Sequence, residues 1–104
     1  MVNIDTVKGE IVERLTPLGV EKIILFGSYA EGTPTESSDI DLFLLTEKST
    51  ENIEAKALFL LRDLMRKYRI GFDVLSATRE FLAQRGDPFY REDILKKGRL
   101  IYGE

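Results

Sequence analysis

The chain has 104 residues, of which 43% are hydrophobic and 32% are charged, and its formal net charge is -3. This length and composition predict a single globular domain over residues 1–104 and exclude a disordered or fibrous protein. Because cysteine and histidine are absent, disulfides, thiolate metal sites and the commonest catalytic base are excluded.

The N-terminal part of the chain is predicted to form a helix and then a buried strand. Residues 5–17 place apolar side chains at helical spacing, with Asp5 as the candidate N-cap and Pro17 near the end of the helix. Residues 23–26 are apolar and lie between a charged segment and a Gly-Ser pair, a pattern typical of a short buried strand. A short helical segment with the sequence SYAEG is expected to follow.

The middle of the chain is predicted to contain a loop, a second strand and a long helix. Residues 32–38 have the composition of a loop, and residues 39–46 combine strand-forming residues with an alternating pattern. Thr50 is the candidate cap of a helix over residues 51–69, which Gly71 is expected to break. The apolar stripe of this helix comprises Ile53, Ala57, Leu60, Leu61, Leu64 and Tyr68.

The C-terminal part is predicted to begin with a third strand over residues 72–77. The remaining predicted features are Thr78 as the cap of a short helix ending near Gly86, Asp87 as the N-cap of a helix over residues 88–97, and an edge strand over residues 99–102. The order helix, strand, strand, helix, strand, helix, helix, strand predicts an α/β (α+β) fold, a small mixed β-sheet covered by helices.

Two aspartates interrupt the second predicted strand. Alternate residues of a strand point to the same face, so the carboxylates of Asp39 and Asp41 can meet, with Cα atoms about 6.5–7 Å apart. Their repulsion would be relieved by a shared proton or by a cation, and a chain without softer ligands favours Mg²⁺ or Mn²⁺. Asp73 lies in the third strand, so three carboxylates could hold two divalent ions for displacement at phosphorus. The alternative is that such an aspartate protects a strand edge or pairs with a local Arg or Ser.

The Gly27-Ser28 pair follows the first strand and precedes the short helical segment. Backbone amides and a hydroxyl at such a turn can bind phosphate oxygens, and a glycine permits close approach of the ligand. The alternative is an ordinary turn with Ser28 as an N-cap. The sequence contains neither a P-loop nor a Gly-x-Gly-x-x-Gly motif, so the turn gains its significance from the aspartates.

The location and the class of ligand can also be predicted. No apolar run approaches the length of a membrane helix, and the N-terminus lacks the apolar segment of a signal peptide, so we expect a cytoplasmic protein with no membrane association. The acidic balance argues against long nucleic acid as a partner and leaves small phosphate ligands open.

The segment GSYAEGTPTESSDID resembles the signature of the DNA polymerase β nucleotidyltransferase superfamily, Gly-Ser followed after ten residues by Asp-x-Asp. The flanking segments ILF, LFLL and FDVL also match, and the resemblance covers residues 20–76 well. It implies a polymerase β-like core that transfers a nucleoside monophosphate from a nucleoside triphosphate, such as ATP, to a hydroxyl.

The resemblance also implies roles for individual residues. Asp39 and Asp41 would bind both Mg²⁺ ions, and Asp73 would complete the catalytic metal site and accept the proton of the attacking hydroxyl. Gly27 and Ser28 would hold the triphosphate.

The short chain is similar to the minimal nucleotidyltransferases, which act as antitoxins in pairs with a HEPN-domain ribonuclease toxin. Some of these antitoxins attach AMP to a tyrosine of the toxin, and this is the leading hypothesis for the chain. The alternative is an antitoxin that neutralises its toxin by contact alone, which Glu31 favours because many relatives carry Arg or Lys there. A nucleotidyltransferase for a small molecule ranks last, since 104 residues leave little material for an acceptor pocket.

Overall fold

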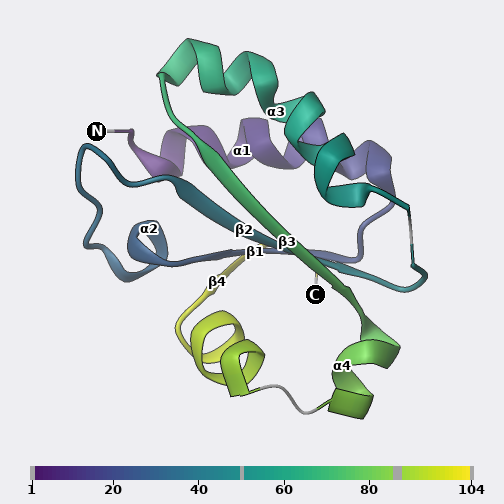
Figure 1. The fold of residues 1–104 in the computed structure, drawn as a ribbon. Helices are drawn as coiled ribbons and strands as arrows, with labels where there is room; N and C mark the ends of the chain where they lie inside the picture. Colours follow the sequence, from purple (N-terminus) through teal and green to yellow (C-terminus); the bar gives the residue numbers. More distant parts are fainter. Residues whose placement is uncertain (1, 50, 86–87, 104) are drawn as a thin grey trace.

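The computed structural model describes residues 2–49, 51–85 and 88–103, which form a four-stranded sheet with helices on both faces (Figure 1). The strand order is β3-β2-β1-β4; β1 is antiparallel to β2 and β4, whereas β2 and β3 are parallel. The predicted mixed sheet is therefore confirmed, with the last strand at an edge as expected. The strands are β1 (Lys22–Phe26), β2 (Ile40–Thr46), β3 (Phe72–Thr78) and β4 (Arg99–Tyr102).

Helix α1 (Ile4–Leu15) begins one residue before the predicted start and continues into a 3-10 turn, η1 (Thr16–Leu18). The predicted N-cap was wrong: the Asn3 side chain accepts a hydrogen bond of 3.0 Å from the Asp5 N–H, so Asp5 lies in the first turn. Both positions carry a capping residue type, and the structure uses the earlier one. Pro17 lies in the 3-10 turn, where the chain leaves the α-helix.

Helix α3 (Ile53–Tyr68) connects the two parallel strands, as a parallel pair requires. The predicted cap Thr50 lies outside the described residues. The helix ends at Tyr68, and its C-cap Arg69 has a left-handed backbone with φ of 53°, two residues before the predicted break at Gly71. Across the described part of the chain, α3 included, no helix combines the length and apolar character that crossing a membrane demands.

The C-terminal elements follow β3. The predicted cap Thr78 is confirmed, because its Oγ1 accepts a hydrogen bond of 3.0 Å from the Phe81 N–H at the start of α4 (Arg79–Arg85). The predicted features at Gly86 and Asp87 lie outside the described residues. The helix expected over residues 88–97 is observed mainly as a π-helix, η2 (Tyr90–Lys96), which the apolar spacing did not distinguish from an α-helix.

The two faces of the sheet are covered differently. Helices α1 and α3 lie over one face, and α4 and η2 lie over the other (Figure 1). Alternation along β2 sends Ile40, Leu42 and Leu44 into the first core and Phe43 and Leu45 into the second. The first core, the α1/α3 core, consists of the buried residues Val7, Ile11, Leu15, Val20, Ile23, Leu25, Tyr29, Ile40, Leu42, Leu44, Ile53, Ala57, Leu61, Leu64 and Phe72. The second, the η2 cluster, consists of Ile24, Phe26, Phe43, Leu45 and Ile94.

Candidate active site

Asp41 and Asp73 are direct neighbours across the parallel pair of strands β2 and β3. Their carboxyl groups are close enough that a hydrogen bond between them favours the protonated form of Asp41. Burial raises the pKa of Asp41 to about 6, and the negative charges of Asp73 and Asp39 and the hydrogen bond to Asp73 act in the same direction. The predicted meeting of acids from neighbouring strands is therefore observed for this pair.

Asp39 lies one residue before β2, not inside the strand as the alternating pattern suggested. The hydrogen bond from the Ile40 N–H to the Gly71 carbonyl, 3.0 Å long, holds this segment against the start of β3. A Cβ added to Gly71 would lie 2.5 Å from Oδ1 of Asp39, so the glycine leaves the space that this carboxylate occupies. The charge of Asp39 still reaches Asp41 and contributes to its raised pKa.

Gly27 connects β1 to the short helix α2 (Ser28–Glu31) and packs directly against Asp41. Its φ of 73° is in the left-handed region, and an added Cβ would lie 2.2 Å from Oδ2 of Asp41. Gly27 itself is the N-cap of α2, so the alternative in which Ser28 serves only as an N-cap is wrong. The Gly-Ser turn and the paired acids thus form one contiguous site.

The carboxylates fit a hard divalent cation in their chemistry, although they are not preassembled around one. Among residues 2–49, 51–85 and 88–103, no three acidic side chains already have the spacing of a metal cluster. Below the raised pKa of Asp41 a proton on that carboxyl relieves the repulsion, whereas near neutral pH the negative charges of Asp41 and Asp73 repel. A cation with a preference for oxygen ligands would replace that proton and remove the repulsion.

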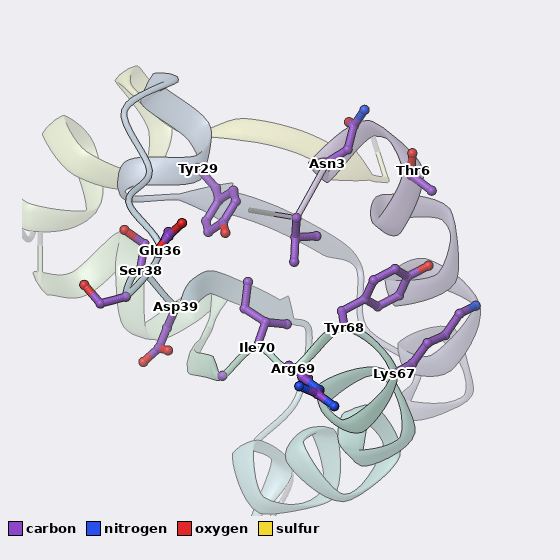
Figure 2. A pocket seen from close by; sticks show the side chains of 13 residues that line it. Asn3, Thr6, Tyr29, Glu36, Ser38, Asp39, Lys67, Tyr68, Arg69 and Ile70 are labelled. Atoms are coloured by element: carbon purple, nitrogen blue, oxygen red, sulfur yellow. The ribbon is translucent and has the colours of Figure 1, made fainter.

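A pocket of about 900 Å³ adjoins this site at Asp39 (Figure 2). It lies between the start of α1, helix α2 and the end of α3, and neither Asp41 nor Asp73 lines it. Tyr29 of α2 and Arg69 after α3 contribute to its wall. Sequence reasoning missed both, because a buried tyrosine in an apolar pattern resembles a core residue and a left-handed arginine has no sequence signature.

Three comparisons with known proteins bear on this arrangement. The sequence model of a family described as "Nucleotidyltransferase domain" matches residues 4–101. A protein of Methanocaldococcus jannaschii named "Putative protein adenylyltransferase MJ0604" is 30% identical over 83 residues, which are 80% of this chain and 79% of that protein.

Two solved structures share the fold. A toxin-antitoxin structure with AMP-PNP has a TM-score of 0.67 at 23% identity, covering 93% of this chain and 73% of that chain. A Shewanella oneidensis complex of a tri-AMPylated HEPN toxin with an MNT antitoxin has a TM-score of 0.64 at 19% identity, covering 98% of this chain and 74% of that chain. At these identities the likeness concerns the fold alone.

Proposed function

The chain belongs to the nucleotidyltransferase domain family, and from its acidic site we propose that it transfers AMP from ATP to a hydroxyl group of a partner protein. The observation that carries this proposal is the pairing of Asp41 with Asp73, against the Gly-Ser turn. Acids that repel one another at neutral pH, beside a turn with a close-approach glycine, are suited to bind a divalent cation and a triphosphate together.

In this proposal the three acids and the turn have separate roles. Asp39 and Asp41 hold two Mg²⁺ ions, Asp73 completes the site, and Gly27 and Ser28 bind the triphosphate. Bound magnesium supplies positive charge that stabilises the transferring phosphoryl group.

The chemical step is a displacement at the α-phosphorus of ATP. The acceptor oxygen forms a bond to that phosphorus, the bond to the bridging oxygen breaks, and pyrophosphate leaves. Asp73, which is exposed whereas Asp41 is partly buried, accepts the proton that the acceptor hydroxyl loses.

The acceptor we propose is a tyrosine of a HEPN-domain ribonuclease toxin, with this chain as its antitoxin. Support comes from the names of similar proteins: one is called a protein adenylyltransferase, and another forms a complex with an AMPylated HEPN toxin. The shared family and fold support the assignment of the same kind of partner to this chain.

A second candidate function is neutralisation of the toxin by contact without catalysis. Glu31 favours it, because this exposed acid ends the helix that begins at the Gly-Ser turn. A negative charge there would weaken the binding of a triphosphate.

One experiment separates the two candidates. The purified chain is incubated with labelled ATP, Mg²⁺ and the product of the neighbouring gene, and label on that partner is measured. Catalysis predicts label that disappears with Asp41→Asn and persists with Asp5→Asn, which removes an exposed acid at the start of α1. Tight binding of the partner without any label would support the contact function instead.

A further inference from the structure

Tyr29 places a polar group inside the pocket that adjoins Asp39. The residue is only 4% exposed, and Figure 2 shows its ring directed from α2 into the pocket. Its hydroxyl has no hydrogen-bond partner among the described residues. Those residues contain no side-chain oxygen that is both fully buried and unsatisfied, so the Tyr29 hydroxyl is not fully buried. The hydroxyl therefore faces the pocket, where a bound group can satisfy it.

Arg69 provides the pocket with a positive charge that the protein does not neutralise. The other cation of the lining, Lys67, forms an ion pair of 3.1 Å with Glu10, which also accepts a hydrogen bond from Tyr68. Arg69 forms no ion pair with any described acid. Its backbone is left-handed, with φ of 53°, a conformation that favours glycine, so the fold retains a charged side chain here at a conformational cost.

The pocket borders Asp39 and neither Asp41 nor Asp73. Asp41 packs against Gly27, where the triphosphate is expected, whereas Asp39 packs against Gly71 and borders the pocket. Neither Gly27 nor Ser28 lines the pocket, so a triphosphate bound at the turn leaves the pocket free for a group of the acceptor protein.

We propose that this pocket recognises the acceptor protein by binding an acidic side chain that lies next to the modified hydroxyl. The Arg69 guanidinium would donate hydrogen bonds to that carboxylate, and the Tyr29 hydroxyl, at another part of the pocket wall, would donate to a second polar group of the acceptor (Figure 2). The inference rests on the proposed AMP transfer and adds the chemistry of acceptor selection. Glu36 and Asp39 also line the pocket and repel acids, so the preference depends on Arg69.

Binding and transfer are measured separately. A fluorescent peptide with one tyrosine between glutamates is compared with the same peptide carrying glutamines, first by anisotropy without ATP or Mg²⁺ and then as an acceptor of labelled AMP. We expect the glutamate peptide to bind at least about tenfold more tightly, the effect of one charge-assisted contact. Arg69→Gln should reduce that preference, and Tyr29→Phe should weaken the binding of both peptides.

The control is Arg66→Gln, which removes the same charge from the exposed surface of α3 outside the pocket. Arg69→Gly is the second pocket variant, because glycine suits the left-handed backbone and should keep the fold. Equal binding of the two peptides, or equal losses with Arg66→Gln and Arg69→Gln, would overturn the proposal. So would an Arg69→Gln variant with a raised KM for ATP and an unchanged preference between peptides.

The two proposals can fail independently. Absence of AMP transfer to peptide and partner alike, with anisotropy still dependent on Arg69, would reject the catalytic function and retain the acid-binding pocket. AMP transfer at equal rates to the glutamate and glutamine peptides would retain the catalytic function and reject the acid-binding pocket.

Discussion

The two faces of the sheet divide stability and chemistry between them. On one face, α1 and α3 cover a continuous core whose side chains are almost completely buried. On the other face, the η2 cluster contains five buried residues, and Asp41 and Asp73 extend the same face beyond that cluster. Strand β2 contributes to both, because its alternate residues point to opposite sides.

The contrast between the two faces indicates where the chain can tolerate unfavourable interactions. Repelling carboxylates destabilise a fold, and a site that holds them depends on stability gained elsewhere. Here the α1/α3 core contains the large majority of the buried apolar side chains, so most of the stability of the fold comes from that face and little is required of the acidic face. Substitutions on the two faces should therefore have opposite consequences for stability and activity.

The largest expected effect is that of Asp41→Asn on catalysis. Loss of a metal-binding carboxylate should lower the rate of AMP transfer at least about a thousandfold, equivalent to about 4 kcal/mol. Because the amide removes the repulsion with Asp73, the same variant should melt at a higher temperature in buffer without divalent ions at pH 7.5. Transfer assays and thermal unfolding by circular dichroism measure the two effects. A variant that lost stability along with activity would break the contrast between the faces.

Leu42→Ala tests the opposite face of the same strand. Leu42 is fully buried next to Asp41, and its truncation should lower the free energy of unfolding by about 2–5 kcal/mol. Urea denaturation measures the loss, and Leu75→Ala on β3 is the matched control, since Leu75 is 43% exposed and should cost far less. Equal losses at the two positions would contradict the assignment of the main core.

Gly27→Ala tests the close contact between the Gly-Ser turn and Asp41. The added methyl group would meet Oδ2 of Asp41 in a left-handed backbone, so we expect about 1–3 kcal/mol of destabilisation. Gly9→Ala is the control: Gly9 lies in α1 with no atom within 4 Å of an added Cβ, and alanine should stabilise the helix by about 0.5–1 kcal/mol. Thermal unfolding should shift in opposite directions for the two substitutions.

The smallest effect should be the dependence of stability on pH without divalent ions. The pKa of Asp41 is raised in the folded state from its ordinary 3.8 to about 6, so folding favours the protonated carboxyl. Stability should be greatest below pH 4 on account of this group and decline as pH rises to about 6, by about 1 kcal/mol after solvent screening. Asp41→Asn should abolish this component of a pH series of unfolding curves, and Mg²⁺ should reduce it. A component that persisted in Asp41→Asn would belong to another group.

Much of the sheet and of the acidic site could be predicted from the sequence, because short-range residue patterns determine them. The alternating pattern placed Asp39 and Asp41 on one face of the second strand, and the apolar neighbours of Asp73 placed that acid in the next strand. The family resemblance, carried by the Gly-Ser turn and the two following aspartates, identified the fold correctly. The roles of the three acids as metal ligands stay a prediction.

Other features depend on contacts that no local pattern records. Asp39 lies outside β2 because the strand begins only where Ile40 pairs with Gly71, which is distant in the sequence. The left-handed conformation of Arg69 follows from how α3 must end before β3 starts. Asn3 and Asp5 could both cap α1, and the difference between them is too small for sequence reasoning to resolve.

The parallel pairing of β2 with β3 has a consequence for the timing of assembly. Asp41 and Asp73 meet only after the intervening chain, including all of α3, has folded back across the sheet. Such long-range closure is slow compared with helix formation, so both acids are brought together in one of the later events of folding. In a newly made or locally unfolded copy the two acids would be apart, so AMP transfer would require that β2, α3 and β3 are folded together.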